Sequence, residues 1–267
     1  MVPGRAQDGS KGERQPEGSK ALITLFGIGL TGLAAAQTAE ELVAKNLQAK
    51  GGIEKIKAIQ SLRMTGRIQG SGGFTAQMGS TAVAPNLRRD TVTIQGMTDI
   101  RAYDGSTGWH ISPFGGRKDP ELMGEDDLRG LVEEADFYGP LVDYQKKDNR
   151  VEYLGHDTVD GDDVYRLKVT LANGDIFYYY LDPDTYLEIR VEMVQFIRGS
   201  VQESFRNFGA YKLVAGVYFP FSIEAGSKQN PGDAARITID RIEANVAVNA
   251  QEFQMPAAPA SAGGKEF

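Results

Sequence analysis

The residues best suited to chemistry gather in one short stretch, "AYDGSTGWHISPF", which covers residues 102–114. It holds Asp104, Ser106, the only tryptophan, Trp109, and one of the two histidines, His110. A serine nucleophile needs an exposed hydroxyl beside a base, and the base must be held by a third group. The Gly-x-Ser-x-Gly motif is absent here, and an Asp-Gly pair is typical of a tight turn. The stretch therefore favours a hairpin over an active site.

Metal ligation and cofactor chemistry also lack a pattern in this sequence. His110 and His156 fall on different expected hairpins, and neither has a second His or Glu at metal-ligand spacing. The aspartates of residues 157–163 do not alternate around a glycine, and no closing Glu follows as a calcium loop requires. The chain has no cysteine, which removes thiolate and disulfide chemistry. We expect no metal, no cofactor and no enzymatic activity; two or more convergent carboxylates inside a cavity would revive the enzyme alternative.

Composition narrows the class of partner. The chain has 267 residues, 41% of them hydrophobic, and a formal net charge of −7 without a stripe of lysine or arginine. Nucleic-acid binding needs such a basic footprint, so we expect no nucleic-acid partner. The hydrophobic content and the absence of a basic stripe favour neutral or amphiphilic ligands.

The N-terminal region has the pattern of a secretory signal peptide. Lys20 precedes an apolar run, Ala21 to Leu33, and small residues lead up to Gln37. The run is shorter than the roughly 20 apolar residues of a membrane span and contains three glycines. We expect residues 1–36 to be a cleaved leader and signal peptide. No cysteine follows the cleavage point, so the mature chain is not lipid-anchored there.

Most of the remaining chain predicts antiparallel strands. Short runs rich in Val, Ile, Tyr and Phe alternate with polar residues, and Gly, Pro, Asn and Asp mark turns about ten residues apart. We count about ten or eleven strands with one apolar face, which must curl and be covered. The predicted class is α+β, mostly β: a single domain over residues 37–256 with an incompletely closed barrel. A disordered tail is expected over residues 257–267.

Three helical segments are expected, two near the start of the mature chain and one in its middle. Thr38 and Glu41 form a capping box that opens a helix through about Lys50, and a shorter helical piece follows over residues 53–59. A third helix is expected over residues 125–137. Its apolar positions recur at i, i+3, i+4 and i+7, so it needs an apolar surface to cover.

Short motifs resemble the LolA-like family of outer-membrane lipoprotein-sorting proteins. The matching positions are Pro85-Asn86-Leu87, Asp104-Gly105, Trp109, Pro113-Phe114, Asn249, Ala250, Phe253 and Pro256. The resemblance implies an open antiparallel half-barrel wrapped over lid or plug helices. It further implies a monomeric, non-catalytic carrier in the periplasm that binds acyl chains of lipoproteins or lipids. Such a carrier passes its cargo between membrane-bound donor and acceptor proteins.

One departure from the family concerns the lid. The family has a basic residue just before the Pro-Asn-Leu stretch that helps to hold the lid shut, and Ala84 stands there. Arg88 or Arg89 could take its place. The same resemblance extends to an alternative function, a periplasmic sensor or regulatory protein that binds lipid or envelope protein without transporting it.

Alternation and the resemblance together predict which residues form the hydrophobic cavity and its lid. Trp109 and Ile111 share one face of a strand and His110 the other, so the tryptophan is expected at the cavity wall or core and the histidine at the surface. The predicted ligand-binding set is Met64, Ile68, Trp109, Ile111, Phe114, Leu128, Leu131, Val132, Leu167, Val169, Ile189, Val191, Phe219 and Phe221.

Overall fold

The computed structural model describes residues 37–197 and 199–257. The leader and signal peptide expected over residues 1–36 and the expected tail from residue 258 lie outside this part of the chain. Three α-helices fall within it: α1 (Ala39–Ala49), α2 (Ile53–Ala58) and α3 (Glu125–Ala135). None of these helices is long and apolar enough to cross a membrane. The capping box is confirmed, because Thr38 Oγ1 accepts from the amide of Glu41 at 3.2 Å and Glu41 Oε2 accepts from the amide of Thr38 at 3.3 Å.

Fifteen strands are found in the described residues, and thirteen of them form one antiparallel sheet. The strands are β1 (Ser61–Gln69), β2 (Thr75–Val83), β3 (Leu87–Ile94), β4 (Met97–Tyr103), β5 (Gly108–Ser112), β6 (Arg117–Leu122), β7 (Arg150–Val159), β8 (Asp162–Thr170), β9 (Ile176–Leu181), β10 (Glu188–Ile197), β11 (Ser200–Gly209), β12 (Lys212–Val214), β13 (Val217–Phe219), β14 (Ser222–Ser227) and β15 (Ala235–Ala244). Strands β12 and β13 form a separate hairpin. The sheet has more strands than the expected ten or eleven.

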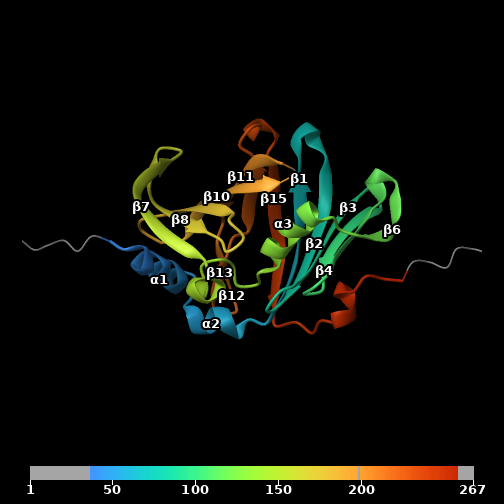
Figure 1. Ribbon diagram of the computed structural model, residues 1–267, viewed down its shortest axis with the longest axis horizontal. Coiled ribbons are helices and arrows are strands. Elements are labelled where there is room, and N and C mark those ends of the chain that lie inside the picture. The colour runs from blue at the N-terminus through green and yellow to red at the C-terminus, as the bar shows by residue number, and fades with distance from the viewer. Residues whose placement is uncertain (1–36, 198, 258–267) are drawn as a thin grey trace, which may run out of the picture. The chain divides into compact units, whose positions relative to one another are not determined.

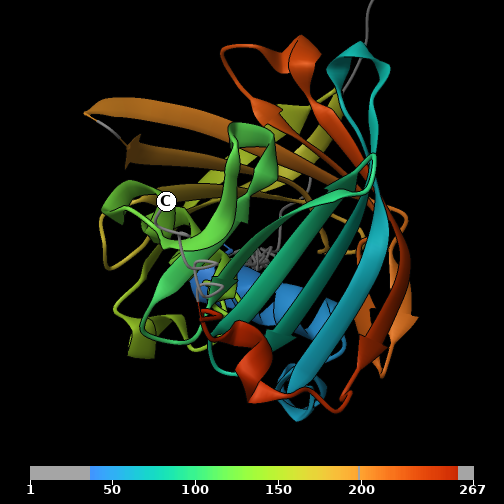
Figure 2. The same cartoon turned by 90° about the vertical axis from the view of Figure 1, so that its right-hand side faces the viewer.

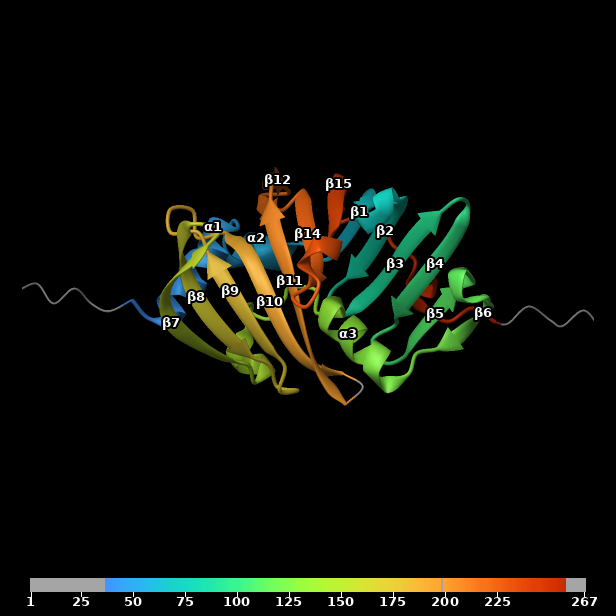
Figure 3. The same cartoon turned by 90° about the horizontal axis from the view of Figure 1, so that it is seen from above.

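The order of the strands shows that the sheet is open. It runs β6-β5-β4-β3-β2-β1-β15-β14-β11-β10-β9-β8-β7, so β6 and β7 are its two edges. The chain lays down β1 to β6 outward from the middle, crosses through α3 and residues 136–149 to the far edge, and returns to β1 through β15. Figures 1 and 3 show α3 between the two groups of strands. The predicted class, mostly β with an open antiparallel half-barrel and few helices, is confirmed.

A bulge at Gly66 bends the middle of the sheet. The register of β1 against β15 shifts between Thr65 and Gly66, and a Cβ on Gly66 would lie 2.3 Å from the carbonyl oxygen of Thr238. Only glycine permits so close an approach of two backbones, and bulges increase the local twist and bend. The concave side of the curled sheet faces α1 and α3, as Figure 2 shows for α1.

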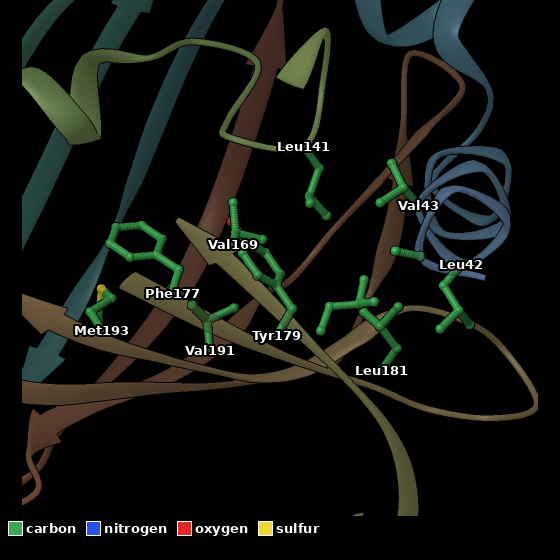
Figure 4. Packing of buried hydrophobic residues seen from close by; sticks show 11 residues of the cluster. Leu42, Val43, Leu141, Val169, Phe177, Tyr179, Leu181, Val191 and Met193 are labelled. Carbon is green, nitrogen blue, oxygen red and sulfur yellow. The ribbon is translucent and has the colours of Figure 1, made fainter. Parts of the chain in front are cut away.

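Strands β7 to β10 have a closely packed concave face, which we call the packed half. Leu167, Val169 and Leu181 are completely buried there, and Leu42 and Val43 of α1 pack onto them. Figure 4 shows Val169 and Leu181 of the sheet beside Leu42 and Val43 of α1, with Leu141 above them. A capped amphipathic helix over alternating strands explains this core.

Strands β1 to β4, β14 and β15 have a concave face that is covered less completely, which we call the hollow half. The end of the hollow half next to α2 is filled by a second cluster of buried apolar residues. In it Ile56 of α2 and the following Ile59 pack with Val142, Phe221 and Ile239. Strand β11 lies between the two halves. The remaining concave surface of the hollow half is where a cavity opens.

Candidate functional site

A cavity with a mainly apolar lining lies over the hollow half. Its volume is about 550 Å³, which falls within the roughly 300–1,000 Å³ of ordinary ligand pockets. Its apolar lining comes mainly from β1, β2, β11, β14 and β15: Met64, Ile68, Met78, Phe208, Phe219, Ile223, Ile237, Ile239 and Ile242. The cavity is therefore suited to an apolar chain.

A second cavity continues toward the packed half. Its volume is about 280 Å³, and its lining includes Phe177, Tyr179, Val191 and Met193. The two cavities share Phe208, Pro220 and, from opposite sides, Arg206 of β11 and Glu134 of α3. Helix α3 thus stands at the boundary between the two cavities.

Helix α3 is anchored to β4 and β5 by a small apolar contact. Leu131 and Ala135 are each 1% exposed and pack with Leu128 and Met123 against Tyr103. Leu128 lies so close to β5 that a Cβ on Gly108 would be 2.4 Å from its Cδ1. The amide of Met123 donates to the carbonyl of Gly108 at 3.0 Å, which fixes the entry to the helix.

Three arginines converge on the carboxylate of Glu134. Arg101 Nη2 donates to Oε2 at 2.5 Å, Arg206 Nη2 donates to Oε1 at 2.8 Å, and Arg88 Nη1 donates to the backbone carbonyl of Glu134 at 3.0 Å. Arg101 and Arg206 belong to β4 and β11, with five strands between them in the sheet order. Strands spaced by 4.7–4.9 Å would hold them about 28 Å apart in a flat sheet. Glu134 therefore joins the two sides of a strongly curled sheet.

Asp90 is the second acid of this cluster. Its Oδ2 accepts from Arg88 Nε at 2.8 Å and lies 3.1 Å from Arg101 Nη2. Burial raises the pKa of Glu134 and of Asp90, but the facing arginines outweigh burial, so each pKa lies below its ordinary value. Both carboxyl groups are ionised at neutral pH. The cluster thus contains three cations and two anions. Its two carboxylates converge at the larger cavity, which is the arrangement that would revive the enzyme alternative. Each is ionised and paired with arginine, so neither holds a proton to donate.

The other side of α3 is bound to the packed half by polar side chains. Arg129 donates both to Oδ1 and to Oδ2 of Asp175, which is 2% exposed, and Gln195 Nε2 donates to Glu133 Oε2 at 2.7 Å. Asn173 Nδ2 donates to Glu133 Oε1 at 3.0 Å. Burial, together with the neighbouring Asp175 carboxyl, raises the pKa of Glu133 to about 8. Glu133 is therefore largely protonated at neutral pH.

Arg88, and not Arg89, reaches helix α3. Arg88 faces the concave side and bonds to the carbonyl of Glu134, whereas Arg89 lies beside Trp109 and Ile111 on the other side of the sheet. The carbonyl of Pro85 accepts from the amide of Phe137 at 3.1 Å. The stretch that begins with Pro85 therefore contacts α3 and the segment after it, although the methyl group of Ala84 is too short to do so.

Nine of the fourteen predicted site residues lie on the concave side or on the docking face of α3. Met64, Ile68 and Phe219 line the larger cavity, and Val191 lines the smaller one. The others fill the cores beside the cavities. Leu167 and Val169 lie beneath α1, and Phe221 lies in the cluster near α2. Leu128 and Leu131 lie on the face of α3 that packs against Tyr103. Val132 was predicted with them, but it is 40% exposed and faces away from Tyr103's cluster.

Trp109 is buried, as one of its two predicted positions required, but neither it nor Ile111 lies at the cavity wall. They do share one face of β5, but it is the convex face, where Trp109 Nε1 donates to the carbonyl of Phe253 at 2.7 Å. Trp109 is 2% exposed and holds the C-terminal turn Ala250–Phe253, while His110, expected at the surface, is half-buried on the concave face. Alternation shows which residues share a face, but long-range packing decides which face is concave.

Ile189 and Phe114 were also predicted to line the cavity, and neither does. The register of β10 shifts between Glu188 and Arg190, so Ile189 packs with Val159, Val164 and Tyr180 on the convex side. A one-residue shift moves a side chain to the opposite face. Phe114 lies in the short turn Pro113–Gly115, is 44% exposed and lines none of the cavities described above.

Sequence reasoning missed the polar residues of the site. Glu134 stands three positions after Leu131 and so shares its face of the helix, which is a readable signal. Arg101 and Arg206 carried no such signal, because alternation marks them only as polar positions of separate strands. No group of three or more His, Cys, Asp or Glu within the described ranges is arranged to hold a metal ion.

Comparisons with known proteins agree with this architecture. No family model and no curated protein matches the chain. Among solved structures, a LolA superfamily protein from Nitrosomonas europaea is similar at a TM-score of 0.56 with 12% identity, covering 82% of this chain and 98% of that chain. A putative outer membrane lipoprotein-sorting protein domain from Vibrio parahaemolyticus is similar at a TM-score of 0.52 with 14% identity. The match covers 79% of this chain and 97% of that chain.

A DUF1329 family protein from Desulfovibrio piger is similar to the same extent, with a TM-score of 0.55, 11% identity and coverage of 81% of this chain and 97% of that one. Likeness at such low identity establishes a shared fold and leaves the ligand open. The open antiparallel sheet with its few helices therefore has the LolA-like fold.

Proposed function

We propose that the protein is an exported carrier that binds acyl chains of lipoproteins or lipids in the cavity over the hollow half and transfers them between membranes. The observation that carries this proposal is a cavity of about 550 Å³ with mainly apolar walls, bordered by a helix with only a small apolar anchor. The Nitrosomonas and Vibrio proteins share the fold, and the second is described as a putative lipoprotein-sorting domain.

Energetics favour an exchange between lid and cargo. Burial of about fifteen methylenes at roughly 0.8 kcal/mol each supplies on the order of 10 kcal/mol before ordering costs. Such binding is reversible only if something competes with the cargo. Helix α3 can compete, because its Glu134 lines the cavity that a ligand enters. No chemical step is needed.

The N-terminal sequence supports a location outside the cytoplasm. Lys20, the apolar run after it and the small residues before Gln37 have the pattern of a cleaved signal. We place the mature protein in the periplasm as a monomer that meets membrane-bound donor and acceptor proteins.

The direct test is to produce the chain from Gln37 onward, purify it without detergent and record native mass spectra. We expect adducts with the masses of acyl lipids or lipopeptides, or uptake of such compounds when they are added. The matched variants are Ile237→Trp, which fills the cavity, and Leu213→Trp at a side chain that is 58% exposed in β12. The first loses the adducts and the second keeps them. A protein that is empty and takes up no added lipid contradicts the carrier function.

A further inference from the structure

We propose that the ligands are anionic amphiphiles, and that their carboxylate or phosphate head group replaces the Glu134 carboxylate among Arg88, Arg101 and Arg206. This inference rests on the proposed carrier function and specifies its substrate class. Glu134 would then act as a built-in substitute for the head group, held in place while the cavity is empty.

The first argument is that displacement of the lid removes the negative charge of Glu134 from the cluster. Asp90 belongs to β3 and stays with the sheet, whereas Glu134 belongs to α3 and leaves with it. With the lid displaced, three guanidinium groups face one carboxylate at the edge of an apolar cavity. Leaving such partly buried cations unpaired is costly. An uncharged ligand incurs this cost when it displaces the lid, whereas an anionic ligand avoids it.

The second argument is the shape of the cluster. Arg101 and Arg206 approach different oxygens of Glu134, at 2.5 Å and 2.8 Å, from opposite sides of the curled sheet. Guanidinium groups arranged in this way suit the oxygens of a carboxylate or a phosphate. The side chains of the three arginines are between 21% and 39% exposed, so water and ions reach them once the lid moves.

The third argument is the position of the cluster relative to the cavities. Glu134 and Arg206 line both of them, and Arg88 and Arg101 line the larger one. A head group in the place of the Glu134 carboxylate therefore starts its chain at the boundary of the two cavities. From there the chain extends over apolar residues such as Met64 and Ile68.

The test compares ligands that differ only in head-group charge. Binding of cis-parinaric acid and of its methyl ester is measured by the fluorescence of the polyene. A second pair, 1-oleoyl-lysophosphatidic acid and 1-oleoylglycerol, is measured by displacement of the bound polyene. We expect at least one acid to bind roughly tenfold more tightly than its uncharged partner, the size of a charge-assisted hydrogen bond. The pair that shows the difference identifies carboxylate or phosphate as the accepted group.

Variants then locate the effect. Arg101→Gln and Arg206→Gln lower the ratio of acid affinity to ester affinity toward one, whereas Glu134→Gln raises both affinities and keeps the wild-type ratio, because the charge that competes with either ligand is gone. The ratio is the readout, since a looser lid changes the affinity for both ligands equally. The matched controls are Arg67→Gln, at a side chain 59% exposed, and Glu125→Gln, at an exposed position of the same helix. Neither control changes the ratio.

The possible failures are distinct. If acids and uncharged partners bind equally in the wild type and in all variants, the anionic site is wrong and the carrier function stands. If an acid binds more tightly but the arginine variants keep the full ratio, the assignment to Arg101 and Arg206 is wrong. If none of the four compounds binds, the carrier function fails and the inference fails with it.

Discussion

The packed half and the hollow half of one concave sheet are built from the same period-two pattern, yet only one of them is a core. In the packed half, α1 begins at a capping box and lays Leu42 and Val43 on fully buried strand residues. In the hollow half, α3 begins at Gly124 without a side-chain cap. It places the charged Glu134 at the sheet where α1 places leucine.

The difference teaches that the covering helix decides whether an apolar sheet face becomes a core or a cavity. A leucine over the packed half excludes water and fills space, so undocking it leaves apolar surface exposed. Glu134 is held by charges that another anion can satisfy. The hollow half is thus suited to exchange, and the packed half holds the sheet in its curled form.

The largest expected effect separates the two halves by stability. Leu167→Ala leaves a void in the packed half and should lower the free energy of unfolding by about 2–5 kcal/mol. Ile68→Ala removes as many carbons from a half-buried side chain at the cavity. It should cost less than about 1.5 kcal/mol, since fewer contacts are lost. Urea unfolding of both variants measures the difference, and equal costs would contradict the distinction between the halves.

The next effect concerns docking of the lid. Leu131→Asp places a carboxylate where the side chain is 1% exposed, so it should release α3 and leave the cavity open. We expect hydrogen exchange of residues 125–135 to accelerate at least about tenfold relative to the wild type. The matched variant Val132→Asp changes a side chain that is 40% exposed and should exchange almost normally. If Leu131→Asp keeps wild-type protection and retains lipid as before, α3 is not a lid.

A smaller effect is a pH dependence on the packed-half side of the lid. Burial and the Asp175 carboxyl raise the pKa of Glu133 to about 8, above its ordinary value of 4.5. The folded chain therefore holds this proton more tightly than the unfolded chain. Docking of α3 is strongest below about pH 4.5 and weakens as the pH rises through about 8. The pKa of Asp175, with Arg129 and the protonated Glu133 as partners, is lowered, so Asp175 stays ionised throughout this range.

Hydrogen exchange of α3, corrected for the intrinsic rate, measures this at about pH 7 and about pH 9. The wild type should lose protection between the two values. Glu133→Gln keeps an amide that can donate to Asp175 and should show no such loss. Glu134 and Asp90 do not contribute in this range, because the pKa of each lies below its ordinary value. A pH dependence that survives in Glu133→Gln would contradict the assignment.

Local sequence signals predicted the elements of this fold. Thr38 with Glu41 marked the first helix, and the i, i+3, i+4, i+7 pattern marked α3. These signals succeed because caps and periodicity act within a few residues of each other. The class followed from them, since a long antiparallel sheet with one apolar face must curl and be covered.

The faces and the polar site could not be predicted in the same way. A bulge at residues 188–190 places Ile189 on the convex side. The alternation of apolar and polar residues around it does not predict this bulge. Arg101 and Arg206 lie 105 positions apart in the sequence. They meet at Glu134 only because β4 and β11 face each other across the curled sheet. Such contacts depend on the order of the strands, which local patterns do not contain.

The smallest expected effect lies on the convex face, behind the hollow half. Trp109→Phe keeps an aromatic ring but loses the bond to the carbonyl of Phe253, so the C-terminal turn should be held less tightly by about 1 kcal/mol. Lipid uptake should not change, because the ring does not line the cavity of about 550 Å³. In the wild type, the emission of this single tryptophan should stay constant when lipid binds. A spectral shift on uptake would return Trp109 to the cavity wall and remove the distinction between the two faces of β5.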